Sequence, residues 1–270
     1  MQTLSILFED EHLVAVNKPA GVATIPTRET RDCVLARIAA QLRLPSSGHS
    51  DPRLRVLHRL DLQTSGVLMF AKHREAQRHL SNQFGAEAGE EGEDVSAGED
   101  GVGETSRIRK EYLALVAGRP SADDGEIDAP LAPHLRRAGA MTIVRDGGKP
   151  ARTRWRIEER FAHFTLLRVF PLTGRTHQIR VHLQSIGLPL AVDALYDPPP
   201  RGQSPGVFLS QFKRGYRATR GENERPLIGR LTLHAAVLEF VHLDGRRIRL
   251  EAPAPKDLRV TLEQLRRHDR

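Results

Sequence analysis

Short runs of β-forming residues, separated by turn residues, constrain the fold of this sequence most. The first two runs, Leu4–Phe8 and His12–Val16, are separated by an acidic turn and followed by the breaker Pro19-Ala20-Gly21. Further strand-like runs occupy residues 66–71, 111–117, 152–158, 164–170, 231–241 and 246–250. The first two runs predict a hairpin, and the whole series predicts a mostly antiparallel sheet.

Four segments have the apolar spacing that is typical of amphipathic helices. They are Arg31–Leu44, His73–Phe84, Thr176–Ile186 and Lys256–Arg267. A sheet with a few flanking helices indicates the α+β class. The length of 270 residues lies within the range of one large domain, so we predict a single catalytic domain over residues 1–270.

Residues 86–107 differ from the rest of the chain in composition. They contain eight acids, one base, five glycines and no aromatic residue. Such a segment buries too little apolar surface to offset the entropy lost on ordering. We therefore predict a disordered acidic insertion here.

The charge balance favours an acidic partner. The chain has 41 Lys and Arg against 34 Asp and Glu, a net charge of +7. Without residues 86–107 it has 40 bases against 26 acids, a net charge of +14. A basic protein of this kind often binds nucleic acid, although general solubility is the alternative and the charge does not distinguish RNA from DNA.

Several classes of protein are disfavoured. No stretch approaches the roughly 20 apolar residues of a membrane-spanning helix. The first twelve residues have no basic leader and no cleavage pattern. A single cysteine, Cys33, allows neither an internal disulfide nor a Cys-pair zinc site and fits a reducing compartment. The sequence therefore predicts a cytoplasmic protein with no membrane association.

A polar cluster immediately before the strand-like run 66–71 is the best candidate for chemistry. It reads His58-Arg59-Leu60-Asp61-Leu62-Gln63-Thr64-Ser65-Gly66. A capped turn, with Asp61 and Thr64 bonded to nearby amides, is the structural alternative to a catalytic role.

This cluster resembles the H-R-L-D-x-x-T-S-G motif of the RluA-like pseudouridine synthases, and the resemblance extends over most of the chain. Other segments are similar to further family motifs: Asn17-Lys18-Pro19-Ala20-Gly21, Lys110-Glu111-Tyr112, the run 172–183 with Thr173-Gly174-Arg175-Thr176-His177, and the tail from Leu233-His234-Ala235 to Ala252-Pro253. Any one of these motifs alone would be weak, but their order along one chain is specific.

The resemblance implies the fold and the reaction. It predicts a curved, mainly antiparallel mixed sheet with flanking helices and a central cleft. It also predicts an RNA pseudouridine synthase that isomerises specific uridines of structured RNA, ribosomal or transfer RNA. The base leaves the sugar at N1, turns over and rejoins through C5, so no cofactor is expected, and the sequence has no phosphate-binding loop, dinucleotide motif or paired-cysteine metal site.

Three residues match the catalytic positions of the family. Asp61 matches the carboxylate that acts as nucleophile at C1′ or as base at C2′. Arg180 matches the partner expected to keep that carboxylate ionised by lowering its pKa. Tyr112 matches the tyrosine expected to stack on the detached uracil. Alone, Arg180 would be interpreted as a surface arginine and Tyr112 as sheet core.

Other motif residues are candidates for substrate binding. Arg59 matches the residue that enters the base stack when the target nucleotide is extruded. His58 belongs to the same motif, and Lys18 and Pro19 are expected to shape the pocket wall. Arg175 and His177 are expected at a phosphate or in the pocket, with capping of a helix as the alternative. His177 and His182 do not share a helix face, so we discount a zinc site.

The chain also departs from the family pattern. Relatives tend to have Gly-Asp after the third motif, whereas this chain has Leu190-Ala191-Val192-Asp193. We expect no S4-like N-terminal domain, and we expect RNA recognition by the catalytic domain. The stretch 201–230 is one candidate, since it has seven bases, two acids and three aromatic residues. For the acidic insertion we weigh two roles, phosphate mimicry that weakens nonspecific RNA binding and a tolerated loop without function.

Two other functions are alternatives. An inactive RNA-binding protein of the same fold would not need the three catalytic residues. A hydrolase that uses Asp61 and water would release free uracil. A monomer is expected.

Overall fold

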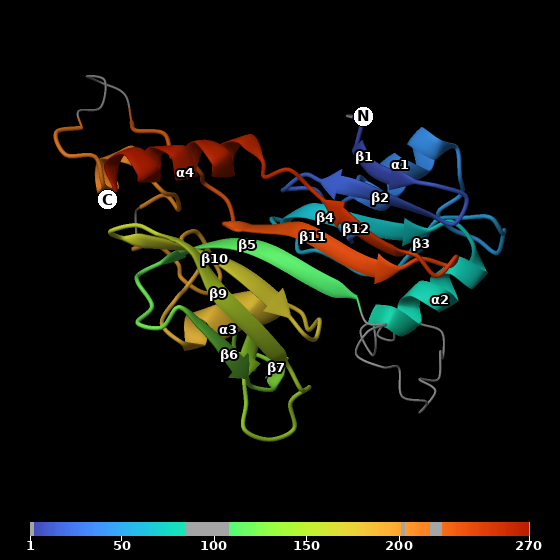
Figure 1. The fold of residues 1–270 in the computed structure, drawn as a ribbon, viewed down its shortest axis with the longest axis horizontal. Coiled ribbons are helices and arrows are strands. Elements are labelled where there is room, and N and C mark those ends of the chain that lie inside the picture. The colour runs from blue at the N-terminus through green and yellow to red at the C-terminus, as the bar shows by residue number, and fades with distance from the viewer. Residues whose placement is uncertain (1–2, 85–107, 201–202, 217–222, 270) are drawn as a thin grey trace. The chain divides into compact units, whose positions relative to one another are not determined.

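The computed structural model describes residues 3–84, 108–200, 203–216 and 223–269 (Figure 1). The predicted disordered insertion, residues 86–107, lies outside them. The chain divides into two compact units, one of residues 1–111 and 235–253 and the other of residues 112–234 and 254–270. Strands β5 (Arg109–Ala117) and β11 (Leu233–Val241) contribute residues to both units.

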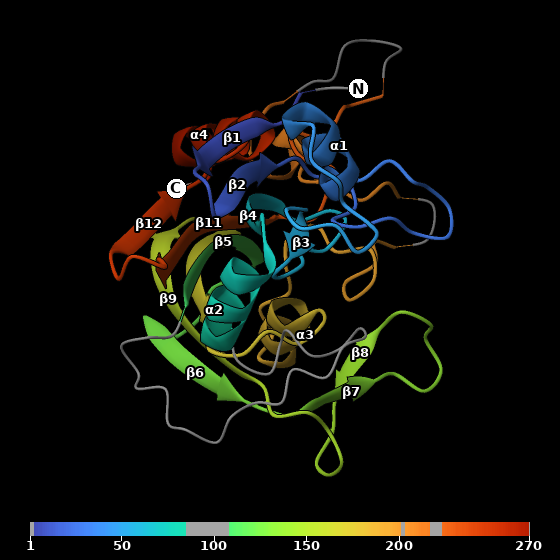
Figure 2. The same cartoon turned by 90° about the vertical axis from the view of Figure 1, so that its right-hand side faces the viewer.

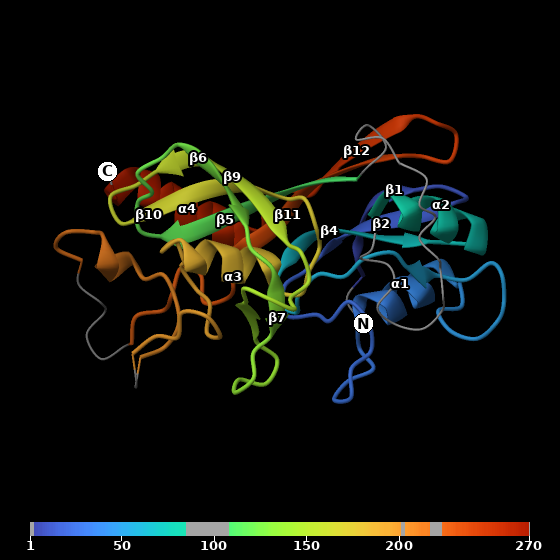
Figure 3. The same ribbon diagram turned by 90° about the horizontal axis from the view of Figure 1, so that it is seen from below.

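The first unit contains antiparallel strands from both ends of the chain. Strand β1 (Ser5–Glu9) pairs with β2 (Leu13–Lys18), which pairs with β4 (Ser65–Ala71), and the two-residue β3 (Arg55–Val56) also pairs with β4. Strand β11 forms a hairpin with β12 (Arg247–Glu251), which Figure 3 shows. All seven residues of β4 are buried, as expected for an apolar run without polar alternation.

Close backbone packing explains the glycine that ends the polar motif. Gly66 has a φ of +120°, and a Cβ atom on it would lie 2.1 Å from the carbonyl oxygen of Ala235 in β11. Only glycine fits this position. The motif therefore fixes how β4 can pack as well as the residues that precede it.

Two helices flank the strands of the first unit. Helix α2 (Arg74–Phe84) packs Ala76, Leu80 and Phe84 against one face of β2 and β4. Figure 2 shows α1 (Val34–Leu42) on the other side of these strands. The side chain of Cys33 caps α1 by accepting the N–H of Ala36 at 3.4 Å.

The second unit has a four-stranded antiparallel sheet between two helices. The strand order is β5, β10 (Phe164–Pro171), β9 (Arg152–Arg160) and β6 (Asp124–Asp128). Helix α3 (Gln178–Ser185) packs on one face and α4 (Lys256–His268) on the other, as Figure 1 shows. Alternation along β5 sends Ala114 and Val116 towards α3 and Leu115 towards α4.

A separate two-stranded ribbon belongs to the second unit. Its strands are β7 (Leu131–Pro133) and β8 (Met141–Ile143). The ribbon packs against α3 through Leu131, Val181 and Tyr196. A short 3-10 helix, η3, covers Leu209–Gln211.

The main elements agree with the sequence predictions. All four predicted helices are present, and each predicted strand overlaps an observed one. The short strands β3, β6, β7 and β8 lie outside the predicted runs. Strands β3, β7 and β8 have only two or three residues, which is too few to show a periodicity. Among the described residues, none of the helices has the length and apolar character needed to span a bilayer. That 1–270 is a single catalytic domain stays a prediction.

Candidate active site

Backbone hydrogen bonds hold the Asp61 loop in the first unit. The Thr24 hydroxyl donates to the Leu60 carbonyl at 3.0 Å and accepts the Leu60 N–H at 3.2 Å. The N–H of Gly21 donates to the Leu62 carbonyl at 2.8 Å, and that of Thr64 donates to the Asp61 carbonyl at 3.0 Å. The loop therefore has a fixed backbone on both sides of the half-buried Asp61.

Lys18 is the central support of this loop. Its side chain is fully buried, and its ammonium donates to the carbonyls of Pro19 at 3.1 Å, Leu62 at 3.1 Å and Thr64 at 2.7 Å. A buried ammonium needs such acceptors to offset its desolvation. Two of the three carbonyls belong to the Asp61 loop, so Lys18 at the end of β2 fixes the path of that loop.

His58 anchors the start of the loop to β4. Its Nε2 accepts the N–H of Met69 at 3.1 Å, and its ring stacks on Phe84 of α2 with centroids 4.8 Å apart. Burial, assisted by the charge of Lys110, lowers the pKa of His58 to about 3. The imidazole is therefore neutral near pH 7, with its proton on Nδ1.

In the second unit, Arg180 of α3 has a fixed orientation. Its Nε and Nη2 donate to the two carboxylate oxygens of Asp193, each at 2.8 Å. The arginine side chain is 10% exposed and the aspartate 1%. The Arg180 Cζ also lies 4.8 Å from the ring centroid of Tyr196. This bidentate and stacked geometry fixes the guanidinium plane.

Asp193 is itself held by the turn that follows α3. One carboxylate oxygen accepts the backbone N–H groups of Leu195 at 3.0 Å and Tyr196 at 3.1 Å. The Tyr196 hydroxyl accepts the N–H of Met141 at 2.8 Å and lies 2.8 Å from Nδ1 of His177. A continuous polar network therefore connects the ribbon, Tyr196, Asp193 and Arg180.

The third motif forms the N-terminus of α3. The Gln178 side chain accepts from the Thr173 hydroxyl at 2.7 Å and the Arg175 N–H at 3.0 Å. His177 precedes the helix with a left-handed φ of +56°, and Nε of Arg175 donates to the Pro150 carbonyl at 3.1 Å. The helix begins two residues later than predicted because Arg175 to His177 form this turn.

Tyr112 lies on the α3 face of the sheet. It is partly buried against the cluster that contains Ala114 and Val116 of β5 and Ile179 and Leu183 of α3. The structure thus brings two of the three predicted catalytic residues, Tyr112 and Arg180, to one face of the second unit. Asp61 belongs to the first unit, so the pairing of Asp61 with Arg180 stays a prediction.

The other predicted residues have clear positions. Arg59 is exposed beside His58, and Pro19 is partly buried after β2. His182 is buried between the Thr153 hydroxyl at 2.9 Å and the Ala129 carbonyl at 3.0 Å. In the described part of the chain, no three His, Cys, Asp or Glu side chains are placed to hold a metal ion.

Sequence reasoning missed several supporting residues. The family pattern marks Asp193 only as the remnant of a Gly-Asp pair, and the predicted site includes neither Tyr196 nor Thr24. The spacing Asp193-x-x-Tyr196 was a usable pattern, because an aspartate often accepts backbone N–H groups two or three residues ahead. No local pattern connected Lys18 to a loop more than 40 residues later in the chain.

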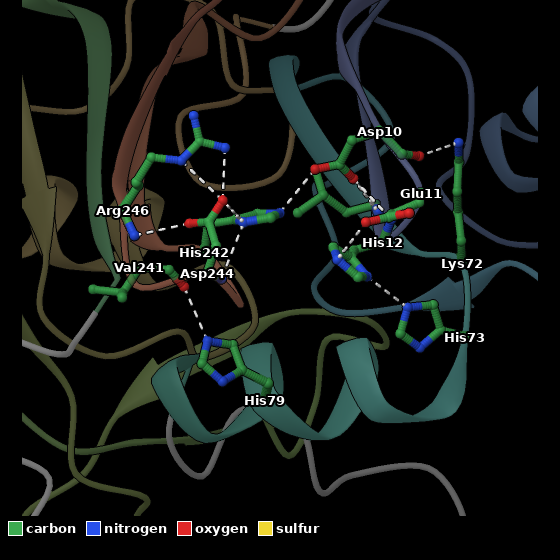
Figure 4. Close-up of polar contacts among 11 residues, drawn as sticks. Asp10, Glu11, His12, Lys72, His73, His79, Val241, His242, Asp244 and Arg246 are labelled. Atoms are coloured by element: carbon green, nitrogen blue, oxygen red, sulfur yellow. Dashed lines mark hydrogen bonds and ion pairs between the residues drawn. The ribbon is translucent and has the colours of Figure 1, made fainter.

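A second polar cluster, in the first unit, involves none of the predicted site residues (Figure 4). His73, which precedes α2, accepts the N–H of Ala76 through Nδ1 at 3.2 Å, and its Nε2 lies 2.9 Å from Nδ1 of His12. Nε2 of His12 lies 3.2 Å from Glu11. Nδ1 of His73 accepts a hydrogen bond, so the ring proton of His73 is on Nε2 and is donated to Nδ1 of His12. Nε2 of His12 in turn donates to Glu11.

The same cluster includes a buried histidine between two acids. Nε2 of His242 lies 2.8 Å from Asp10, and Nδ1 lies 3.0 Å from Asp244. Burial would raise the pKa of Asp10, but the N–H groups of Leu13 and His12, together with His242, lower it. Arg246 lowers the pKa of Asp244 well below its usual value.

Comparison with known proteins identifies the family. Residues 12–185 match the family model described as RNA pseudouridylate synthase. The chain belongs to this family, whose members isomerise uridine in RNA, and specifically to the RluA-like group that the motifs resemble.

Two curated relatives illustrate the similarity. The chain is 37% identical over 265 residues to the ribosomal large subunit pseudouridine synthase C of Yersinia pestis, covering 97% of this chain and 69% of that one. It is 36% identical over 267 residues to the ribosomal large subunit pseudouridine synthase D of Nitrosomonas europaea, covering 97% and 65%. The protein is therefore an RNA-modifying isomerase.

Solved structures support the fold. Human RNA pseudouridylate synthase domain containing 4 aligns with a TM-score of 0.64 at 24% identity, over 97% of this chain and 93% of that chain. The human domain containing 1 aligns with a TM-score of 0.63 at 23% identity, over 94% and 84%. Both agree with the predicted α+β pseudouridine synthase fold.

Proposed function

We propose that Asp61 is the catalytic carboxylate of this pseudouridine synthase, that Tyr112 and Arg180 complete its active site, and that its substrate is ribosomal RNA. The observation that carries the assignment of Asp61 is the support of its loop. Six hydrogen bonds that involve Lys18, Gly21, Thr24 and Thr64 fix the backbone on both sides of Asp61. A group that must reach one atom of a sugar benefits from such a rigid support.

The chemistry needs an ionised carboxylate beside the ribose. Asp61 either attacks C1′ or removes a proton from C2′, and both routes release uracil from N1 while it stays bound. The base then rotates and forms its new bond to the sugar through C5. The reaction consumes no oxidant and no second substrate, so we expect it to proceed without a cofactor.

Arg180 is proposed as the charge partner of Asp61. The bidentate pair with Asp193 and the Tyr196 ring fix its guanidinium plane. Because lysine lacks the planar fork, Arg180→Lys should lose this orientation. We expect a large loss of kcat with little change in RNA affinity.

The remaining motif residues have proposed roles in binding. Arg59, which is exposed beside the Asp61 loop, is expected to fill the stack left by the extruded uridine. His177 and Arg175 are proposed to contact RNA near α3. His58, Lys18 and Pro19 are proposed to act through the loop, since the polar atoms of His58 and Lys18 contact backbone groups.

Ribosomal RNA is the proposed substrate because the curated relatives are named for the ribosomal large subunit. Transfer RNA is the second candidate. A cytoplasmic location and a monomeric state are also proposed, since ribosomal RNA is a cytoplasmic substrate in bacteria and one chain carries all the motif residues.

The deciding experiment combines two assays. Pseudouridines are mapped by carbodiimide labelling in ribosomal and transfer RNA from cells with and without the gene. The purified full chain and its Asp61→Asn variant then react with an unmodified transcript of the RNA so identified. We expect one or a few sites to depend on the gene and Asp61→Asn to form no pseudouridine, while the surface variant Asp123→Asn reacts like the wild type.

Other results would point to different functions. Free uracil in place of pseudouridine would indicate a hydrolase. RNA binding without any turnover would indicate an inactive RNA-binding protein. Normal turnover by Asp61→Asn would exclude the proposed role of Asp61.

A further inference from the structure

Two histidines of the first unit share a hydrogen bond that the proposed reaction does not use. Nε2 of His73, directly before α2, lies 2.9 Å from Nδ1 of His12, directly before β2 (Figure 4). The ring centroids are 5.2 Å apart, with an angle of 69° between the ring planes. We call His12 and His73 the histidine pair. Because histidine changes charge between about pH 5 and pH 8, the pair is a candidate for a pH-dependent contact.

Each ring nitrogen of the histidine pair has a defined role. Nδ1 of His73 accepts the N–H of Ala76 at 3.2 Å, so the ring proton of His73 is on Nε2 and is donated to His12. Nε2 of His12 carries the other ring proton and lies 3.2 Å from Glu11. An additional proton can therefore be taken up only on Nδ1 of His73 or on Nδ1 of His12.

An additional proton on either atom costs the bond to Ala76. On Nδ1 of His73 the proton points at the N–H of Ala76, which loses its acceptor. On Nδ1 of His12 the proton points at the Nε2 proton of His73, and the rings stay bonded only if that His73 proton moves to Nδ1. Both routes keep a hydrogen bond between a charged and a neutral ring, which is about twice as strong as a bond between neutral groups. The weaker bond to Ala76 is therefore the one that is lost.

The bond to Ala76 holds the first turn of α2. His73 accepts the N–H of Ala76 through its side chain and the N–H of Gln77 through its carbonyl, the latter at 3.0 Å. Ala76 itself is fully buried in the core beneath the helix. At the far end of α2, the Phe84 ring stacks on His58, which anchors the candidate active-site loop. The seating of α2 is therefore part of the support of that loop.

Charged groups of both signs face the histidine pair. Asp10 accepts the backbone N–H of His12 at 2.8 Å, and the His242 ring centroid lies 5.4 Å from that of His12. The N–H of Lys72, directly after β4, donates to the His12 carbonyl at 2.8 Å. The other charged neighbours are Glu11 beside His12, Arg74 and Glu75 at the start of α2, Asp51 with its partner Arg55, and Asp244 with Arg246 next to His242. Because cations and anions are both present, the surrounding charge does not prevent the uptake of a proton.

We infer that the histidine pair is a pH-sensitive cap of α2, in which uptake of one proton removes the acceptor of the Ala76 N–H and loosens the first turn of the helix. The bond that stabilises this turn is made in neutral solution and lost as the pH falls. The inference goes beyond the proposed function and does not depend on it, because the change takes place within the first unit and involves no RNA.

Hydrogen exchange of the Ala76 amide in the purified full chain tests the cap at about pH 7.5 and about pH 5. The protection factor compares the intrinsic exchange rate with the measured rate at the same pH, and in the wild type it should fall at the lower pH. This fall should exceed that of a variant with an acceptor that cannot be protonated by roughly 5-fold, the factor that corresponds to about 1 kcal/mol for one helix cap.

Two substitutions of His73 imitate the two states of the cap. His73→Asn keeps an acceptor but cannot be protonated, so Ala76 should stay protected in acid, at roughly 5-fold the wild-type value. His73→Ala provides no acceptor, so the protection of Ala76 should be low at both pH values. His79→Asn is the matched control, because Nε2 of His79 on the same helix donates to the Val241 carbonyl at 3.1 Å and keeps this bond when the ring is protonated. This control should show the same fall as the wild type.

Nitrogen NMR of the wild type with labelled histidine follows the pair without any substitution. At neutral pH the ring proton of His73 should be on Nε2 alone. In acid Nδ1 of His73 should carry a proton, and this change should accompany the fall in the protection of Ala76.

Two results would overturn the inference. One is a loss of Ala76 protection in acid that is as large in His73→Asn as in the wild type. The other is uptake of a proton by the pair while Nδ1 of His73 stays unprotonated, because the rings then separate and the cap survives. Pseudouridine formation is a separate assay, so a failure of the proposed function leaves both measurements valid.

Discussion

At the scale of single residues, Lys18 and Arg180 show two ways in which a buried cation is accommodated. Arg180 is paired with the carboxylate of Asp193, whereas Lys18 donates to three backbone carbonyls. The carboxylate of Asp193 fixes the Arg180 side chain. The bonds from Lys18 instead fix the stretch of backbone whose carbonyls accept them. The difference matters because two of those carbonyls belong to the Asp61 loop.

Lys18→Met tests this role. The substitution leaves three carbonyls without their donor in a site from which the protein excludes water, and each unsatisfied group costs about 1–3 kcal/mol. We expect the free energy of unfolding to fall by at least about 3 kcal/mol in urea titrations. Lys256→Met, at an exposed position at the start of α4, should change it by less than about 0.5 kcal/mol. Equal urea midpoints for Lys18→Met and Lys256→Met would show that Lys18 does not support the Asp61 loop.

His58 should make the stability depend on pH. Its pKa is lowered to about 3 in the folded protein, whereas an unfolded histidine titrates near 6.5. Between these values the unfolded chain binds a proton that the folded one does not, so stability falls as the pH is lowered. We expect His58 to contribute a loss of about 2 kcal/mol between pH 7 and pH 5.

The measurement is urea unfolding at both pH values. His58→Gln removes the titrating ring. Its free energy of unfolding should therefore fall by about 2 kcal/mol less than that of the wild type between pH 7 and pH 5. His49→Gln, at an exposed histidine, should retain the full dependence. The same slope in wild type and His58→Gln would show that the ring is not protected from protonation.

At the scale of secondary structure elements, the boundaries of helices depend on side chains that precede them. Helix α1 begins with the sulfur of Cys33 as acceptor and α2 with Nδ1 of His73. Neither residue belongs to the usual set of capping residues. The apolar spacing therefore predicted that these helices exist, but not which atoms begin them.

The cap of α2 leads to a specific prediction. His73→Ala removes the acceptor of the Ala76 N–H and should lower the free energy of unfolding by about 1 kcal/mol. His73→Asn restores an acceptor and should be close to the wild type. Hydrogen exchange of the Ala76 amide should be faster in His73→Ala alone, and an unchanged rate would show that His73 does not cap α2.

At the scale of the whole molecule, charge is divided unequally along the chain. Residues 86–107 hold eight acids and one base, and their removal raises the net charge from +7 to +14. The N–H of Ile108 donates to the Gln83 carbonyl at 3.3 Å. The residues on either side of the segment are therefore close together, and a short Gly-Ser linker can replace it.

Replacement of residues 86–107 by such a linker should raise affinity for unrelated RNA at low salt, because repulsion between the acids and phosphate is lost. The increase should disappear in high salt. A second variant with the eight acids changed to Gln, Asn or Ser at full length separates charge from length. Unchanged affinity in filter binding for both variants would favour a tolerated loop.

The sequence by itself determined the α+β class, the four helices, the main strands and the motif residues Asp61, Tyr112 and Arg180. These conclusions depend on patterns within a few residues, or on order along the chain, which any sequence displays directly. Its composition also set a basic charge that suits RNA.

Only the tertiary structure decided what supports these residues. Lys18 meets carbonyls that are 44 and 46 residues away along the chain, Asp193 pairs with Arg180, and Leu135 is left fully exposed at the tip of a ribbon. The physical reason is the same in each case. Such contacts depend on where the chain returns in space, and a local pattern of apolar and polar residues does not specify which distant backbone group a side chain will meet.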